Sequence, residues 1–402
     1  MTTRRRSIRS GASVLLTVLL AAVAAGDARG ELTRSSLEPL TPAVERQIEA
    51  GAIPGAVVLI GRRAEILYRR AAGDRERTPK KVAMTEDTIF DLASLTKVIA
   101  TGTAVLQLVE SRRLALDEPA AEYWPEFAAN GKAQITVRQL LTHTSGLRAD
   151  IDTRKAWSGY SEGLRKIAAE RPIREPGAVT IYSDINFQVL GELVRRTAGL
   201  PLDEYCARFI FGPLGMKDTG FCPPPGLRDR IAPTSLWRGV AISGTVHDPT
   251  ACRMGGVAGN AGLFGTADDL ARFAQMMLGG GGLDGARILA PATVAMMTAP
   301  QGPAGRPGTR GLAWDLDTPF GGAGGRSAGV YGHSGYTGTS LWVDPASGTY
   351  VIILSNRVYP SGRGDARPLR REVAAVVEAA LGNPQVKRSI AGLSSPSPRF
   401  HP

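Results

Sequence analysis

Strand-forming segments lie near both ends of this 402-residue chain, and helix-forming segments occupy the middle. Residues 56–61 and 65–70 are rich in apolar side chains around a short polar turn, which predicts a β-hairpin. Further strands are predicted over residues 312–316, 340–344 and 350–355. Because strands from the two ends can pair in one antiparallel sheet, we expect an α+β fold in which helices flank that sheet and a mainly helical lobe is inserted.

The apolar periodicity also predicts seven helices. In the first, Thr41 is the expected N-cap and Pro42 the first helical residue. The predicted helices cover residues 42–50, 94–111, 137–141, 187–197, 202–209, 267–278 and 367–381.

These elements predict one domain over residues 36–382, divided into two lobes. Residues 36–125 and 251–382 would form the α/β lobe, and residues 126–250 the helical lobe. A ligand site is expected in the cleft between the lobes. Residues 383–402 are rich in Ser and Pro and are predicted to be a disordered tail.

The N-terminus has the pattern of a secretory signal peptide. Four arginines among residues 4–9 precede an apolar run over residues 12–25, and small residues follow it. The run is shorter than the about 20 residues that an ordinary membrane span needs. We therefore expect residues 1–30 to be removed and the protein to be periplasmic or secreted, with membrane attachment only if the segment stays uncleaved. The pattern leaves open whether export is by the general or the twin-arginine route.

Composition excludes several classes of protein. The formal net charge is +11, but five of the arginines lie within residues 1–30 and the other basic residues are scattered, so no nucleic-acid partner is expected. Three Cys and four His argue against a structural zinc cluster. Cys206, Cys222 and Cys252 allow one disulfide, such as Cys206–Cys222, or three buried free thiols.

Ser94 and Lys97 stand three residues apart at the start of the predicted helix 94–111, which is apolar around most of its circumference. Residues at this spacing share one helix face. Burial disfavours the charged form of a lysine, so Lys97 is expected to help remove the proton of Ser94. The alternative is a polar pair at a helix start.

Tyr182-Ser183-Asp184 follows a loop marked by Pro176-Gly177. A tyrosine held in such a loop beside a nucleophile can act as an acid or base when cations are near. The alternative is that Tyr182 and Asp184 only cap the helix that follows.

The segment 332–338 is rich in glycine and precedes the predicted strand 340–344. A glycine-rich edge strand lets a substrate backbone approach and pair with it. His333 could deliver a proton or bind an anionic group. The alternative is a simple turn at the end of a strand.

Together, Ser94-Leu95-Thr96-Lys97, Tyr182-Ser183-Asp184 and His333-Ser334-Gly335 resemble the active-site motifs of serine β-lactamases and penicillin-binding proteins. The resemblance is greatest to the class C β-lactamase branch, with its DD-peptidase and esterase relatives. Segments 135–147 and 255–264 add to it, and it extends over about residues 36–382.

The resemblance implies an exported serine hydrolase with a β-lactamase-like fold that forms an acyl-serine intermediate. Ser94 would be acylated, and Lys97 and Tyr182 would share the roles of general base and acid. The N–H groups of Ser94 and Tyr336 would form the oxyanion hole. Substrate-binding positions would include Asp184, His333, Ser334 and Gly335. The implied substrate is a β-lactam, a D-Ala-type peptide from peptidoglycan or a small ester, cleaved by a monomer without a metal or cofactor.

Two departures from the β-lactamase pattern affect substrate choice. Asp184 stands where many β-lactamases have Asn, and His333-Ser334-Gly335 stands where they have Lys-Thr-Gly. If His333 titrates near the usual pKa of about 6.5, it would bind carboxylates only at lower pH. We therefore expect small neutral esters to be cleaved better than β-lactams at alkaline pH.

Two other classes of protein remain as alternatives. One is a non-catalytic, penicillin-binding-like cell-wall binder or regulator. The other is an α/β-hydrolase with its nucleophile at Ser161 in Gly159–Gly163 or at Ser334. That fold needs a strand before the serine and a helix after it. Residues 152–155 are not strand-like, and a strand follows Ser334, which argues against it.

Overall fold

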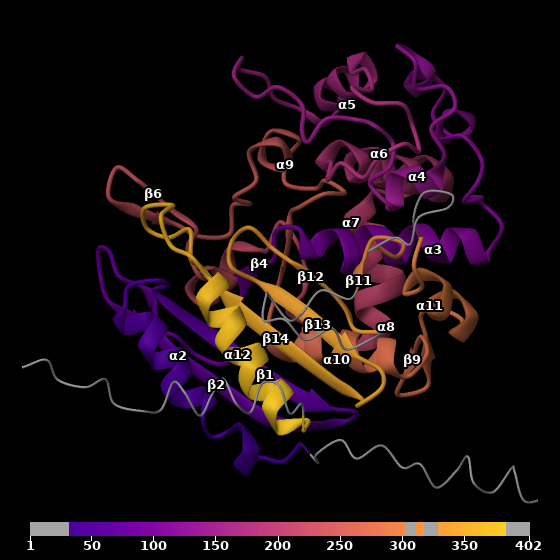
Figure 1. The fold of residues 1–402 in the computed structure, drawn as a ribbon. Coiled ribbons are helices and arrows are strands. Elements are labelled where there is room, and N and C mark those ends of the chain that lie inside the picture. Colours follow the sequence, from indigo (N-terminus) through magenta and orange to yellow (C-terminus); the bar gives the residue numbers. More distant parts are fainter. Residues whose placement is uncertain (1–31, 302–309, 317–328, 383–402) are drawn as a thin grey trace, which may run out of the picture.

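A seven-stranded antiparallel sheet joins the two ends of the chain (Figure 1). The computed structural model describes residues 32–301, 310–316 and 329–382, so the predicted signal peptide and the predicted tail lie outside the described residues. The strand order is β11-β12-β13-β14-β1-β2-β3. Its strands are β1 (Gly55–Arg62), β2 (Glu65–Glu76), β3 (Val82–Ala83), β11 (Asp315–Leu316), β12 (Tyr331–Ser334), β13 (Ser340–Asp344) and β14 (Thr349–Ser355).

The central pair of the sheet is β1 with β14, in a register that places Ala56 opposite Ser355 and Arg62 opposite Thr349. Alternate residues of β1 face two separate apolar cores, as the period of a strand requires. Val57 and Leu59 belong to the larger core, whereas Val58 belongs to the smaller one. The expected pairing of strands from the two ends of the chain is confirmed.

Helices cover both faces of this sheet. Helices α2 (Leu40–Glu49) and α12 (Arg367–Ala380) pack on the smaller core and lie side by side over one face in Figure 1. Helix α10 (Ala267–Leu278) covers the other face, where it contacts β1, β13 and β14. The fold is therefore α+β, with helices on both faces of an antiparallel sheet, as predicted.

The remaining helices gather beyond α10, on the side away from α2 and α12 (Figure 1). They are α3 (Thr103–Glu110), α4 (Val137–Leu141), α5 (Tyr160–Ala169), α6 (Asp184–Ala198), α7 (Leu202–Cys206), α8 (Gly212–Leu214), α9 (Pro249–Arg253) and α11 (Pro291–Met297). The shorter helical turns are η1 (Ser35–Leu37), η2 (Lys97–Gly102), η3 (Ala120–Glu122), η4 (Pro125–Ala128), η5 (Ala207–Phe211) and η6 (Pro225–Arg230).

Small sheets complete the structure. The first has three strands, with β8 (Leu263–Gly265) between β4 (Phe90–Asp91) and β5 (Gly220–Phe221). The second is the hairpin of β6 (Ser235–Trp237) and β7 (Val240–Ile242). The third pairs β9 (Gly282–Leu283) with β10 (Ala286–Arg287). The first of these sheets matters for the site, because β4 leads directly to Ser94.

Several predicted elements differ from those in the structure. Helix α2 begins at Leu40 with Pro39 before it, so the predicted N-cap at Thr41 is wrong. The predicted helix 94–111 consists of a tight turn at Ser94, the wide π-helical turn η2 and then α3. Helix α5 and the β6–β7 hairpin were not predicted.

The cysteines do not form the disulfide, such as Cys206–Cys222, that the sequence allows. All three are free, and Cys206 is buried, whereas Cys222 and Cys252 are exposed. The alternative of three buried thiols is therefore also wrong. In the described part of the chain, no helix has the length and hydropathy that a membrane span requires.

Candidate active site

Ser94 stands at the end of a strained turn that leaves β4. Ala93 has a φ of 48°, which non-glycine residues rarely adopt. The carboxylate of Asp91 accepts hydrogen bonds from the Ala93 N–H at 2.9 Å and from the His247 N–H at 2.7 Å. Such strain is typical of functional sites, where the surrounding contacts maintain it.

Two threonines attach the turn at Ser94 to the segment between β12 and β13. Thr337 Oγ1 donates to the Asp91 carbonyl at 2.7 Å, and Thr339 Oγ1 donates to the Leu92 carbonyl at 3.0 Å. Gly335 fits between them, because a Cβ there would lie 2.6 Å from the Leu92 carbonyl oxygen. The first and third sequence motifs are therefore adjacent in the structure.

The loop between α9 and β8 packs on the other side of Ser94. Thr101 Oγ1 donates to the Gly259 carbonyl at 2.7 Å, and the Leu263 N–H donates to Thr96 Oγ1 at 3.1 Å. The Asn260 carbonyl accepts from Lys97 Nζ at 2.9 Å. The segment 255–264, which added to the resemblance, thus holds the helix that carries Lys97.

Lys97 is fully buried and links the first two motifs. Its Nζ lies 2.9 Å from Ser94 Oγ and 2.6 Å from Asp184 Oδ1. Burial lowers the pKa of Lys97, but the attraction of Asp184 and Tyr182 outweighs burial and holds that pKa above its usual value. The expectation that burial would favour a neutral Lys97 is therefore wrong.

Tyr182 stands at the mouth of this group, 37% exposed. Its ring centroid lies 5.1 Å from Lys97 Nζ, and its ring stacks on His143 with centroids 4.4 Å apart. His143 is buried, and its Nδ1 accepts the Ser183 N–H at 2.9 Å. Burial lowers the pKa of His143 well below its usual value, so its ring is a neutral support under Tyr182.

His333 faces Tyr182 from β12, with ring centroids 6.0 Å apart. It is only 2% exposed, and its Nδ1 lies 3.0 Å from the Ser334 carbonyl oxygen. Burial, with the nearby charges of Lys97 and Arg310, lowers the pKa of His333 to about 4 despite the attraction of Asp315. The expected titration near pH 6.5 is wrong, and His333 is neutral at physiological pH.

Arg310 is a further residue at the mouth of the site that no motif indicated. Its Cζ lies 5.4 Å from the ring centroid of Tyr182, and its guanidinium pairs with Asp315 at 2.7 Å. A guanidinium stays charged in proteins and can bind a carboxylate through two parallel hydrogen bonds. Sequence reasoning missed it because it precedes β11 by several residues and becomes adjacent to Tyr182 only through tertiary packing.

The remaining predicted residues lie along the same edge. Ser334 pairs with Ser340 at the end of β12. Tyr336 is 62% exposed, and the Arg357 guanidinium lies 4.2 Å from its ring centroid. Among the described residues, no hydrogen-bond acceptor faces the backbone N–H of Ser94 or Tyr336, which leaves both available to a ligand.

Asp184 is the first residue of α6 and has two carboxylates beside it. Oxygen atoms of Asp150, Asp184 and Asp248 lie within 4.8 Å of one another. Asp150 accepts from Gln188 Nε2 at 3.0 Å and from Thr250 Oγ1 at 2.7 Å. Burial raises the pKa of Asp150 to about 6, although these hydrogen bonds oppose it. Such carboxylates could hold a divalent cation, but the Lys97 ammonium already balances one of their charges.

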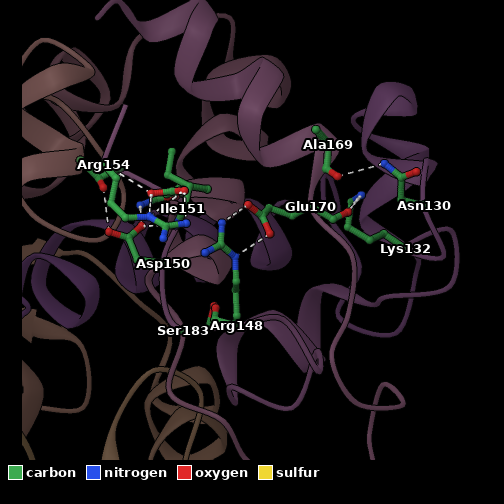
Figure 2. Close-up of polar contacts among 12 residues, drawn as sticks. Asn130, Lys132, Arg148, Asp150, Ile151, Arg154, Ala169, Glu170 and Ser183 are labelled. Atoms are coloured by element: carbon green, nitrogen blue, oxygen red, sulfur yellow. Dashed lines mark hydrogen bonds and ion pairs between the residues drawn. The ribbon is translucent and has the colours of Figure 1, made fainter. Parts of the chain in front are cut away.

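Partly buried polar contacts lie next to Ser183 of the second motif (Figure 2). Arg148 makes a two-pronged ion pair with Glu170, and its carbonyl accepts from Ser183 Oγ at 2.6 Å. Lys132 lies beside Glu170 in Figure 2 and donates to the Glu170 carbonyl at 2.5 Å. It also donates to the Ala168 carbonyl at 2.9 Å. The second motif is thus fixed by contacts with α5 and the loops around it.

The α/β-hydrolase alternative has no structural counterpart. Ser161 lies in the first turn of α5, with no strand before it, and Ser334 lies within a strand. Neither serine has the strand–turn–helix environment that such a nucleophile needs.

Comparisons with known proteins agree with this geometry. A family model described as Beta-lactamase matches residues 40–375. A protein of Escherichia coli (strain K12), named "Putative D-alanyl-D-alanine carboxypeptidase", is 34% identical over 355 residues, which cover 78% of this chain and 80% of that protein.

Two solved structures share the fold. "EstCE1, a hydrolase with promiscuous acyltransferase activity" has a TM-score of 0.71 and 24% identity, covering 86% of this chain and 99% of that one. A penicillin-binding protein homologue from Caulobacter crescentus has a TM-score of 0.70 and 24% identity, covering 87% and 99%.

Proposed function

Because this chain belongs to the β-lactamase family of serine hydrolases, we propose that it cleaves D-alanyl peptides derived from peptidoglycan through an acyl intermediate on Ser94. The observation that carries the proposal is the 2.9 Å contact between Ser94 Oγ and the fully buried Lys97 Nζ. The N-terminal pattern supports action outside the cytoplasm, in the periplasm or medium.

The charge at the mouth of the site supports a substrate with a free carboxylate. Arg310 supplies a positive charge beside Tyr182. His333, which also faces Tyr182, is neutral and supplies no charge there. A peptide that ends in D-alanine carries such a carboxylate. The relative named as a D-alanyl-D-alanine carboxypeptidase supports the same substrate class.

The geometry supports the following reaction. Ser94 Oγ attacks the carbonyl carbon while its proton passes to the Lys97 and Tyr182 pair, and the N–H groups of Ser94 and Tyr336 bind the oxyanion. The C–N bond then breaks, and the leaving amine takes a proton from Tyr182 or from the Lys97 side of the site. Water cleaves the resulting ester on Ser94 and restores the enzyme.

A second candidate function is hydrolysis of small neutral esters. It is favoured by the buried, neutral His333, which stands where many β-lactamases have a lysine. An ester without a carboxylate would not need Arg310, so the two functions differ in their dependence on that residue.

Covalent labelling tests the acyl-serine step. The full-length chain is treated with a fluorescent penicillin or a fluorophosphonate, and intact mass spectrometry with peptide mapping follows. We expect one adduct, at Ser94, that Ser94→Ala abolishes and Ser161→Ala leaves unchanged. A panel of nitrocefin, p-nitrophenyl esters and D-Ala-D-Ala peptides then identifies the substrate class. An unlabelled Ser94 with no turnover of the panel would instead indicate a non-catalytic cell-wall binder.

A further inference from the structure

The peptide group that joins Gly335 to Tyr336 has a different environment at each of its polar atoms. Its N–H is the Tyr336 donor proposed for the oxyanion hole, and no acceptor among the described residues faces it. Its carbonyl oxygen, which belongs to Gly335, accepts from the Gly338 N–H at 3.1 Å and from the Arg370 guanidinium at 3.1 Å. A charged side chain therefore contacts the same peptide group whose N–H is available to a ligand.

The shape of a peptide group determines where this N–H points. The Gly335–Tyr336 bond is trans, and a planar trans peptide directs its C=O and N–H to opposite sides. Arg370 reaches the carbonyl from α12, which lies over the face of the sheet opposite to α10 (Figure 1). Leu92, two residues before Ser94, belongs to the larger core on the face that α10 covers. The N–H therefore points away from α12, to the side on which Ser94 stands.

Arg370 is placed for contacts with backbone carbonyls. One guanidinium nitrogen, Nη2, donates to the Gly335 carbonyl and also to the Thr339 carbonyl, the latter at 2.8 Å. The Thr339 carbonyl accepts the Gly335 N–H at 2.7 Å, so this nitrogen connects both ends of the turn 335–339. Nε of Arg370 is buried without a hydrogen-bond partner in the described structure. Because an unpaired buried donor is unfavourable, stability alone is a weak reason for this placement.

A positive charge on the carbonyl strengthens the N–H of the same peptide. Hydrogen bonds from a guanidinium are charge-assisted, and linked hydrogen bonds polarise one another. Burial, with repulsion from Arg357, lowers the pKa of Arg370 to about 10, which still leaves the guanidinium charged at neutral pH. We propose that Arg370 is a positioning residue for the oxyanion hole, which orients the Gly335–Tyr336 peptide and strengthens its N–H as a donor. The proposal rests on the acyl-serine function proposed above.

Other contacts hold the backbone after this peptide in place. Arg357 Nε donates to the Tyr336 carbonyl at 2.6 Å, and the Arg357 N–H donates to the Thr337 carbonyl at 2.9 Å. Thr337 is also attached to the Asp91 carbonyl through its hydroxyl. Among the described residues, Arg370 is the side chain that donates to the Gly335 carbonyl. Loss of Arg370 should therefore weaken the N–H while the neighbouring backbone stays attached.

Arg370→Met tests this role, because methionine keeps an apolar stem and has neither donor nor charge. With p-nitrophenyl acetate, we expect kcat and kcat/KM to fall together by about 10-fold to 100-fold, with KM changed less than about twofold. An oxyanion forms only in the transition state, so a weaker donor lowers kcat rather than substrate binding. The loss of a whole oxyanion-hole donor, which costs about 100-fold to 1,000-fold in kcat, sets the upper limit.

The carbonyl stretch of the acyl-enzyme gives a readout that a purely structural role would not move. Ser94 is acylated with a penicillin or a p-nitrophenyl ester that carries carbon-13 at its reactive carbonyl, and isotope-edited infrared difference spectra are recorded. Donors in an oxyanion hole polarise the ester carbonyl and lower its stretching frequency. The band should therefore move to higher frequency in Arg370→Met.

Two further variants provide a rescue and a control. Arg370→Lys retains a positive charge, and its kcat and carbonyl band should lie between those of the wild type and Arg370→Met. Arg371→Met removes an exposed guanidinium from the next position of α12. It is the matched control and should retain the wild-type kcat and the wild-type band.

The outcomes separate this inference from the function on which it rests. A wild type that is neither acylated nor active overturns the proposed function. An active wild type whose Arg370→Met variant keeps its kcat, or loses activity through KM alone with an unchanged carbonyl band, overturns the role of Arg370. If Arg370→Met does not fold, Arg370→Gln decides between the two, because it keeps an amide donor without the charge. A lower kcat with a band at higher frequency supports the role, and an unchanged band opposes it.

Discussion

The charge that a substrate meets at the mouth of the site depends on Arg310 rather than on His333. His333 is buried with a pKa lowered to about 4, so it gains no charge in the physiological range. The Arg310 guanidinium lies beside Tyr182 and forms an ion pair with Asp315. Carboxylate binding should therefore be independent of pH between 5 and 8, contrary to what a titrating histidine would give.

Arg310→Met tests this assignment. We expect KM for a peptide ending in free D-Ala-D-Ala to rise about tenfold, in line with the loss of one charge-assisted hydrogen-bonded pair, while KM for the same peptide with a C-terminal amide stays unchanged. Arg310→Met also leaves the Asp315 carboxylate without its ion-pair partner. The double variant Arg310→Met/Asp315→Asn removes that carboxylate, so any change in KM that remains is due to the lost guanidinium. A wild-type KM for the D-Ala-D-Ala peptide that falls steeply as pH decreases from 7 to 5 would instead assign carboxylate binding to a protonated His333.

The approach of the β12–β13 segment to the turn at Ser94 depends on the absence of a side chain at Gly335. A Cβ at this position would overlap Thr339 Oγ1 and lie 2.6 Å from the Leu92 carbonyl oxygen, so Gly335→Ala must push the two segments apart. Misplacement by about 1 Å can cost on the order of 100-fold in rate. We expect a loss of that order in kcat/KM with a small change in melting temperature.

Gly226→Ala is the matched control, because nothing lies within 4 Å of a Cβ there and its φ is not positive. It should retain wild-type kcat/KM. Unchanged activity in Gly335→Ala would show that Tyr336 and Ser94 tolerate separation, and would weaken the proposed oxyanion hole.

Elements with local signals were predictable from the sequence. Helix α4 has a capping box between Thr136 and Gln139, helix α10 has an N-cap at Thr266, and both occupy the predicted bounds. The start of α2 was misplaced, because Pro39 takes a helical φ of −62° and ψ of −12° and allows the helix to begin before Thr41. The π-helical turn at Lys97–Gly102 contacts the loop of Gly259 through Thr101, and no local sequence pattern indicates it.

The site was predictable to a similar extent. Ser94, Lys97 and Tyr182 lie in short sequence motifs, and the structure brings them together. The ring of His143 under Tyr182 and the guanidinium of Arg310 reach the site from segments far away in the sequence, and only the fold brings them there. The charged state of Lys97 was not predicted, because its ion pair with Asp184 depends on a distance of 2.6 Å that spacing does not reveal.

The larger apolar core extends from one face of the sheet into the helical region. It includes Val57 and Leu341 from the sheet and also Phe187 and Leu190 from α6, in the region predicted to be a separate helical lobe. A core that crosses a predicted lobe boundary makes independent unfolding of the lobes unfavourable. The division at residues 125 and 250 therefore remains a prediction about shape.

Calorimetry of the purified protein checks the consequence for stability. We expect a single transition in which the calorimetric and van't Hoff enthalpies agree, because unfolding either lobe would expose part of the shared core. Two resolved transitions, or a calorimetric enthalpy well above the van't Hoff value, would mean that the lobes unfold separately.

The pairing of β1 with β14 also has a consequence during synthesis. Strand β1 can pair with β2 soon after both leave the ribosome, but its other edge pairs with residues 349–355, near the end of the chain. At about 5–20 residues per second, that edge waits on the order of tens of seconds for its partner. An open apolar edge invites pairing with other chains. Nascent chains should therefore need protection by a chaperone until their last strand arrives.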